Sequence, residues 1–182
     1  RHGPDVVLRP SVGAADAQKN IAQLKIAIAR LNAAPKSGEW ISGPVVGNIP
    51  AGVRSSIMPK SADTQQLVED VVQRSLRPIL GAQFTENEGE RMIARAYNPR
   101  LDEATNADRL GRLQTSLQRA LDAKKAAALY FEKNGTLEGY QGVRTITGDD
   151  IINDAGLSAR GSPTSSGGWT DLGGGVRIRE KR

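Results

Sequence analysis

Apolar residues recur with a helical period in several stretches of the chain, and segments without that period separate them. In residues 14–33, Ile21, Leu24, Ile28 and Leu31 fall at steps of three, four and three, so they share one face of a predicted helix. So narrow a stripe suits a helix packed on its own domain, and it suits one strand of a short coiled coil equally well. The sequence leaves both alternatives open.

The clearest periodicity lies in residues 61–134, which we predict to form the helical core. Helices are expected over 61–80, 85–97 and 102–133, because apolar residues repeat there every three or four positions. Thr85 and Glu88 match a capping box at the start of the middle helix. The long helix carries four leucines that we predict to pack against neighbouring helices: Leu110, Leu113, Leu117 and Leu121.

Proline and glycine dominate the segment between the first two predicted helices. Residues 34–60 hold four prolines and four glycines, which argues against a long helix or strand. The same segment contains apolar residues such as Trp40 and Ile41, which disordered linkers usually lack. Loops of this length are uncommon inside compact domains. We therefore predict an extended arm that lies across another surface.

Residues 135–182 form a tail rich in glycine and serine. Ordering such a segment costs about 1–2 kcal/mol per residue, which its few apolar side chains cannot offset. We therefore expect another subunit to hold the tail. Near its end, apolar and basic residues alternate with the period of an edge strand, at Val176, Arg177, Ile178 and Arg179.

These patterns predict an all-α fold, a small antiparallel helical bundle with long extended N-terminal, internal and C-terminal arms. The predicted order is an arm over 1–13, a helix over 14–33, an arm over 34–60, the helical core over 61–134 and the extended tail over 135–182. The composition agrees, because only 38% of the residues are hydrophobic, below the about 45–50% of typical globular domains.

The residue types needed for several kinds of chemistry are missing. The chain has no cysteine, which excludes disulfides, zinc–thiolate sites and thiol catalysis. Its single histidine, His2, lies in the predicted N-terminal arm, so a histidine triad or metal site is hard to build. No apolar run is long enough for a transmembrane helix. We predict no catalytic residues, no cofactor and no metal site.

The first residue is Arg1, and no signal-peptide pattern follows it. We therefore interpret the chain as a piece of a longer protein.

Carboxylates at the predicted helix starts are the remaining candidates for catalysis: Glu86, Glu88, Glu90, Asp102 and Glu103. A hydrolase of the glycosidase type needs two carboxyl groups at a fixed separation in a cleft. Carboxylates near a helix N-terminus also interact favourably with the helix dipole. This structural interpretation accounts for the positions, so we predict that the chain is not an enzyme.

The formal net charge of +5 permits contact with nucleic acid without requiring it. Basic residues lie along the long helix at Arg109, Arg112, Arg119, Lys124 and Lys125. Nucleic-acid binders often show such a series, but acidic residues interrupt this one, which fits a solvated face with local ion pairs. The tail ends in four more cations that could contact DNA phosphates or an acidic protein groove: Arg177, Arg179, Lys181 and Arg182. A helical DNA-binding module is therefore the alternative function.

Two tryptophans lie outside the predicted helices, Trp40 in the internal arm and Trp169 in the tail. A tryptophan in an irregular segment either folds back on its own domain or anchors the chain in a partner's pocket. We predict the anchoring role for Trp169, whose neighbours supply no local core. The predicted partner-docking residues are Trp40, Trp169, Val176, Arg177, Ile178 and Arg179.

The stretch 61–142 resembles helical segments of virion proteins of tailed bacteriophages. The residues that carry the resemblance are Ile79–Pro99 (ILGAQFTENEGERMIARAYNP), Asn106–Leu110 (NADRL) and Tyr130–Tyr140 (YFEKNGTLEGY). The ending Gly168–Arg179 (GWTDLGGGVRIR) is similar to the tails of some phage internal or DNA-ejection proteins. The resemblance implies a structural protein of the particle, acting in DNA ejection or at the portal–tail channel. It transfers no catalytic residue.

Residues and resemblance together predict a non-enzymatic assembly protein of a virion, present in multiple copies. Its expected partners are other virion proteins and copies of itself, with DNA as a further candidate and no small-molecule substrate. The expected location is the virion, assembled in the host cytoplasm. The residues support the assembly role, and the viral assignment comes from the resemblance.

Overall fold

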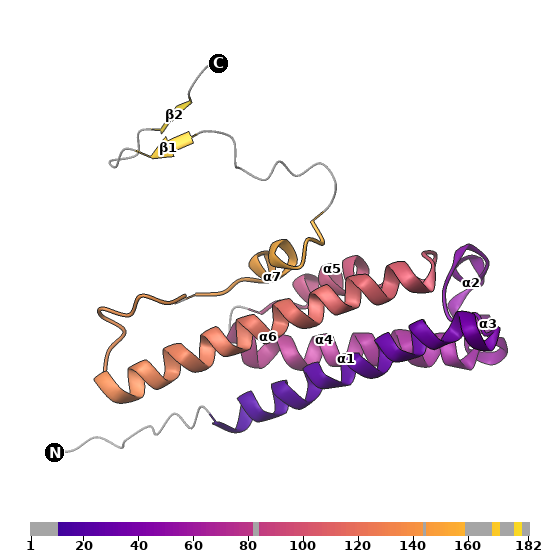
Figure 1. The fold of residues 1–182 in the computed structure, drawn as a ribbon, viewed down its shortest axis with the longest axis horizontal. Helices are drawn as coiled ribbons and strands as arrows, with labels where there is room; N and C mark the ends of the chain where they lie inside the picture. Colours follow the sequence, from indigo (N-terminus) through magenta and orange to yellow (C-terminus); the bar gives the residue numbers. More distant parts are fainter. Residues whose placement is uncertain (1–10, 82–83, 144, 159–168, 172–176, 180–182) are drawn as a thin grey trace.

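The computed structural model describes residues 11–81, 84–143, 145–158, 169–171 and 177–179. The predicted all-α class is confirmed over these residues, because helices account for most of them and the two strands have three residues each. Figure 1 shows long helices side by side, with shorter helices at one end and along one flank.

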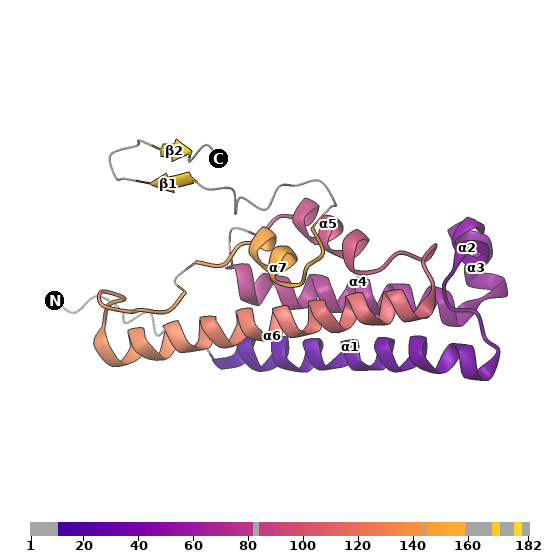
Figure 2. The ribbon, with the colours of Figure 1, turned by 45° about the horizontal axis from the view of Figure 1, so that its top comes forward.

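Three long helices form the centre of the molecule: α1 (Ser11–Ser37), α4 (Pro59–Leu80) and α6 (Glu103–Asn134). Helix α1 packs against both of the others, which is visible in Figure 2. It runs in the opposite direction to α6, because Gln18 is hydrogen-bonded to Gln118 while the N–H of Ile41, just after α1, donates to Glu103. The first helix therefore packs within its own chain, which decides between the two alternatives that its sequence left open.

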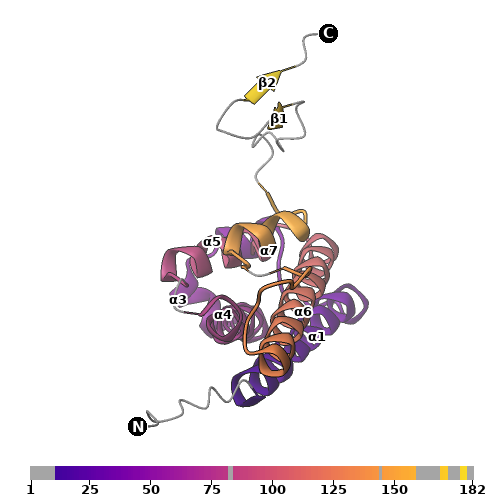
Figure 3. The ribbon, with the colours of Figure 1, turned by 90° about the vertical axis from the view of Figure 1, so that its left-hand side faces the viewer.

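Two further helices cover the flank of α4 and α6 that faces away from α1: α5 (Glu86–Ala96) and α7 (Gly148–Asp154). The arrangement is clear in the end-on view of Figure 3. The predicted capping box forms at the start of α5, with the Thr85 hydroxyl accepting from the N–H of Glu88. Helix α7 lies on α6, where the Ser116 hydroxyl donates to the Ile151 carbonyl over 2.9 Å. Residues 148–157 are thus part of the fold, and the prediction of an extended tail from 135 onward is wrong for them.

One hydrophobic core joins these five helices. The four leucines expected to pack on the long helix are each at most 1% exposed. On α1, alanines share the buried face with larger residues, and small side chains at a helix contact permit a close interaxial approach. The largest buried side chains are Ile21, Leu24, Leu31, Leu76, Met92, Leu110, Leu113, Leu117, Leu121 and Ile151.

The internal arm predicted over 34–60 is not extended. Helix α1 continues to Ser37, and two short helices follow it at one end of the long helices: α2 (Pro44–Asn48) and α3 (Ala51–Ile57). The prolines explain the difference. Pro44 and Pro59 are the first residues of α2 and α4, and Pro50 is the N-cap of α3. Proline is favoured at a helix start, because the N–H groups there have no partner within the helix.

The chain ends are described only in part. Residues 1–10 of the predicted N-terminal arm lie outside the described residues, and Ser11 already belongs to α1. Near the C-terminus, β1 (Trp169–Asp171) pairs antiparallel with β2 (Arg177–Arg179). The strand predicted there therefore has its partner in the same chain.

Candidate functional site

Residues 38–58, here called the cap segment, connect α1 to α4 and contain α2 and α3. The segment carries four large apolar side chains that stay exposed, and we call these four residues the cap patch. On α3, Val53 and Ile57 are one turn apart and therefore share a face. The exposed fractions are 58% for Trp40, 54% for Val45, 52% for Val53 and 59% for Ile57.

The backbone of the cap segment is fixed to the start of α6. The Glu103 carboxylate accepts hydrogen bonds from the N–H groups of Ile41 and Ser42, at 3.2 and 3.1 Å. The Ile41 side chain is buried in the core, and so is that of Val46 on α2. Charge-assisted bonds of this kind are stronger than neutral ones, so Glu103 serves as an anchor for the chain leaving α1.

A close backbone approach fixes α2 as well. The N–H of Gly43 donates to the Pro99 carbonyl over 2.8 Å. A Cβ atom at Gly47 would lie 2.6 Å from the Cα and 2.7 Å from the backbone nitrogen of Arg100. Only glycine fits at such a distance, because backbone atoms cannot rotate away as a flexible side chain can.

Polar side chains are buried where α3 of the cap segment meets α4. Arg54 is only 6% exposed, and its Nη2 donates to Gln65 Oε1 over 2.8 Å. Its Nε has no hydrogen-bond partner among the described residues, and the same holds for the hydroxyls of Ser61 and Tyr97. Among the described residues the Arg54 cation has this hydrogen bond and no ion pair, and a buried cation without an ion pair costs stability.

Burial raises the pKa of Tyr97 to about 12, from an ordinary value of 10.0. The nearby Arg54 charge acts in the opposite direction and the Glu103 carboxylate adds to the rise. The phenol is therefore neutral at physiological pH, and it cannot act there as a base.

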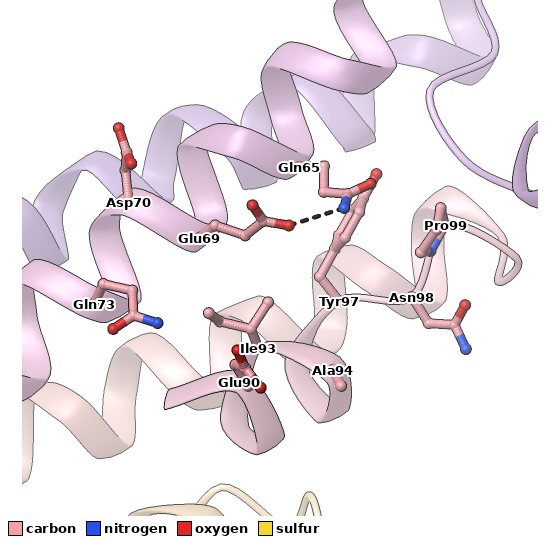
Figure 4. A pocket seen from close by; sticks show the side chains of 10 residues that line it. All are labelled: Gln65, Glu69, Asp70, Gln73, Glu90, Ile93, Ala94, Tyr97, Asn98 and Pro99. Carbon is pink, nitrogen blue, oxygen red and sulfur yellow. Dashed lines mark hydrogen bonds between the residues drawn. The ribbon is translucent and has the colours of Figure 1, made fainter. Parts of the chain in front are cut away.

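Beside this cluster, a groove of about 740 Å³ runs between α4 and α5. Figure 4 shows Gln65, Glu69 and Asp70 on its α4 side, with Glu90 on the α5 side. Gln65 Nε2 donates to Glu69 Oε1 over 2.8 Å, which links Arg54 to the groove through one glutamine. The side chains lining the groove include three carboxylates and no cation. Asp70 pairs with Arg74 on the same helix, and the remaining two, Glu69 and Glu90, make the groove favourable for basic groups.

The carboxylates considered for catalysis have structural partners at three positions. Glu88 completes the capping box of α5, and Asp102 is the N-cap of α6. The hydroxyl and the N–H of Thr105 both donate to Asp102 and hold the pKa of that carboxyl below its usual range. Glu103 anchors the cap segment. Glu90 lines the groove, and Glu86 lies in the first turn of α5.

The basic side chains along α6 mostly bind groups of their own chain. Arg119 pairs with Asp154, and Arg112 pairs with Asp108 and also donates to carbonyls after α7. Lys124 donates to the carbonyls of Pro78 and Ile79, and its partial burial lowers its pKa. Arg109 donates to the Arg95 carbonyl, and Lys125 donates to Gln18 Oε1. The helix therefore presents no continuous free basic face in the described residues.

The structure brings only some of the predicted docking residues together, in the strand pair where Trp169 lies opposite Arg179. Trp40 is exposed in the cap segment. The backbones of Trp169, Arg177, Ile178 and Arg179 belong to the strand pair, and Val176 lies outside the described residues. The predicted docking residues did not include three members of the cap patch, which the sequence places only among the apolar residues of the internal arm: Val45, Val53 and Ile57. The spacing of the last two was a usable signal, but it applies only once residues 51–57 are taken as helical.

Comparison with known proteins gives no assignment. The sequence matches no protein-family model, and no curated protein and no solved structure is significantly similar to it. Within the described residues, no group of three or more acidic or histidine side chains could hold a metal ion. None of the described helices combines the length and hydropathy needed to cross a bilayer.

Proposed function

We propose that this protein is a non-enzymatic assembly protein that binds a protein partner through the cap patch. The carrying observation is that four large apolar side chains are each more than half exposed on one short segment. We take these four side chains to form one patch, and exposed apolar patches mark interaction surfaces.

The anchoring of the cap segment supports the same proposal. Glu103 and the contact between Gly47 and Arg100 hold its backbone against the core. Such a surface loses little conformational entropy when a partner binds, because it is already ordered in the free protein. Arg54 of the same segment is buried without an ion pair among the described residues, and local departures from optimal stability of this kind are expected where a fold serves a function.

The partner we propose is another protein of a tailed-bacteriophage particle, with the chain present in several copies. This part rests on the resemblance of residues 61–142 and of the tail to phage virion proteins. In this view an antiparallel bundle of helices is the rigid support, and the C-terminal tail is a second docking element. A place in DNA ejection or at the portal–tail channel follows from the same resemblance.

The test is incorporation of the chain into particles formed in cells that supply only one version of it. Val53→Asp combined with Ile57→Asp places charges on the cap patch and should reduce the copy number at least tenfold. Ser56→Asp adds a charge at an exposed polar position of the same helix and should leave incorporation unchanged. Circular dichroism of the purified variants checks that all of them fold.

Equal incorporation of the charged double variant and the control contradicts the proposal. Binding of the purified chain to duplex DNA that weakens steeply with salt would instead support the DNA-binding alternative. An assembly protein that contacts only protein shows no such salt dependence.

A further inference from the structure

The second half of α6 extends past its neighbours, as Figures 1 and 2 show. We call residues 122–134 the overhang, because no side chain of α6 beyond Leu121 is buried. The last hydrogen bonds from the overhang to other long helices come from Lys124 and Lys125. Farther along, Tyr130 donates only to Glu138, in the loop that follows the helix. The side chains of the overhang are therefore exposed or half-buried throughout.

One face of the overhang is continuously exposed. Its residues follow each other at steps of four, three and four, so they form a single stripe along the helix. Leu129 in the middle of the stripe is 65% exposed, the largest value among the exposed apolar residues. The full stripe, here called the overhang stripe, is Asp122, Ala126, Leu129 and Lys133, and all four are exposed.

The described neighbours of α6 contact other faces of the helix. Gln118 reaches α1 and also donates to Asp122 Oδ1 of the stripe over 3.0 Å, and Arg119 reaches α7. Tyr130 is covered by the ring of Tyr140, with 5.1 Å between the ring centres. The overhang stripe points between these contacts, so its apolar residues have no cover in the described part of the chain.

The order of residues in this stripe is self-complementary. When two copies lie antiparallel with the two-fold axis midway between Ala126 and Leu129, Asp122 of each copy faces Lys133 of the other. Ala126 then faces Leu129, so a large side chain meets a small one twice. A parallel pair would place Asp122 beside Asp122 and Lys133 beside Lys133. Like charges at close contact are unfavourable, so the charges select the antiparallel arrangement.

We infer that a second copy of this chain binds along the overhang stripe, forming a two-fold symmetric, antiparallel helix pair. The geometry allows this contact because each overhang extends beyond its own helical core, so the two cores lie at opposite ends of the pair. A two-fold contact uses the same surface on both copies, which the stripe satisfies by itself.

The contact is small, which sets the expected affinity. At about 1.5 Å per residue the overhang is about 20 Å long, and it buries less than the roughly 1,200 Å² of a stable interface. The isolated chain should therefore dimerise weakly, with a dissociation constant of about 10 µM to 1 mM. The inference rests on the proposed assembly function in one respect: a multi-copy particle supplies the high local concentration that makes a weak contact effective.

Charge reversal tests the pairing directly. In sedimentation equilibrium of the full chain at low salt, Asp122→Lys should weaken dimerisation at least tenfold, and Lys133→Asp should do the same. The double variant Asp122→Lys/Lys133→Asp restores both charge pairs with their signs exchanged, so its dissociation constant should return to within about threefold of the original. All four positions of the stripe are exposed, so the variants should keep the thermal unfolding of the parent chain.

Cysteine cross-linking gives the register. The chain contains no cysteine, so any disulfide that forms joins two introduced cysteines. Under mild oxidation, a mixture of the Ala126→Cys and Leu129→Cys chains should form the mixed disulfide dimer in preference to either homodimer. Leu129→Cys mixed with the off-stripe control Ser56→Cys should not cross-link above background.

The inference is overturned by a chain that stays monomeric up to millimolar concentration, or by a double charge reversal that fails to restore dimerisation. Neither result bears on the cap patch, whose variants are read by incorporation into particles. The opposite outcome is also distinguishable. If the single charge reversals weaken dimerisation, the double reversal restores it and the cap variants are incorporated normally, the proposed function is overturned and the helix pair stands.

Discussion

The two halves of α6 differ in what covers them. Eight side chains are buried between Glu103 and Leu121, and none is buried beyond it. The reason lies in the neighbouring helices, because α4 ends at Leu80 and α1 begins at Ser11, close to the level of Lys124 and Lys125. The first half supports the fold, while the second half leaves apolar side chains free for a partner. Periodicity along one helix does not by itself distinguish these roles.

Matched leucine truncations should give the largest contrast between the two halves. Leu117→Ala removes a side chain that is 0% exposed and should lower the free energy of unfolding by about 2–5 kcal/mol. Leu129→Ala removes one that is 65% exposed and should change it by less than about 0.5 kcal/mol. Urea denaturation followed by circular dichroism, at a concentration where the chain is monomeric, measures both. Equal losses would mean that the overhang is covered within the monomer.

Tyrosines sharpen the comparison through pH. The folded-state pKa of Tyr97 is raised to about 12, so the folded chain keeps a proton that the unfolded chain loses near pH 10. The contribution of the protonated Tyr97 to the free energy of unfolding is fully present below pH 10. It is lost as the pH rises towards 12, by roughly 2–3 kcal/mol in total. Tyr97→Phe should remove that part of the loss. Tyr130→Phe, in the overhang, should show the same loss of stability at alkaline pH as the parent chain, because Tyr97 is unchanged.

Denaturation curves between pH 9 and 12 check this prediction. At pH 7 the Tyr97→Phe variant should lie within about 1 kcal/mol of the parent chain, since the Ser61 hydroxyl acts on the Tyr97 hydroxyl without forming a bond of good geometry. The same alkaline loss in both chains would show that Tyr97 is not the group responsible.

Long periodic segments were predictable from the sequence, and the cap segment was not. The central helices carry apolar residues every three or four positions, and Thr85 with Glu88 is a clear start signal for one of them. Between 38 and 58 the helices are too short for a period to appear, and prolines at helix starts were taken as interruptions. Local signals are ambiguous there, because Pro44 fits both a loop and the first turn of a helix.

The candidate site was predictable only at Trp40. Which valines and isoleucines of the cap segment face outward depends on the anchors from distant residues, above all Glu103 and Arg100. The sequence identifies Glu103 as a carboxylate at a helix start, and Glu103 is the first residue of α6. Its bonds to Ile41 and Ser42 span about sixty positions along the chain, and no local pattern encodes them.

The backbone of the cap segment is held against the start of α6 at Gly47, and glycine substitutions in the cap segment test this contact. Gly47→Ala places a Cβ against the backbone of Arg100 and should cost about 1–3 kcal/mol. Gly52→Ala is the matched control, since a Cβ there meets nothing within 4 Å. It should be neutral or stabilise α3 by about 0.5 kcal/mol. Thermal unfolding measures both, and equal melting temperatures would mean that the cap segment is not fixed at Gly47.

The smallest expected effect concerns the end of the overhang itself. Gly135 ends α6 in the left-handed conformation, with φ at 70°, so Gly135→Ala should cost about 1 kcal/mol. Because no side chain of the overhang is buried, that cost should appear as fraying of residues 126–134, with little change in global unfolding.

Gly111→Ala lies in the covered half of the same helix, where a Cβ meets nothing within 4 Å, and should instead stabilise the whole fold by about 0.5–1 kcal/mol. Hydrogen exchange resolves the two outcomes by peptide: faster exchange confined to 126–134 for the first variant, slower exchange across the core for the second. Fraying that spread into the core in the Gly135 variant would show that the two halves of α6 unfold together, and the overhang could not then be treated as a separate docking element.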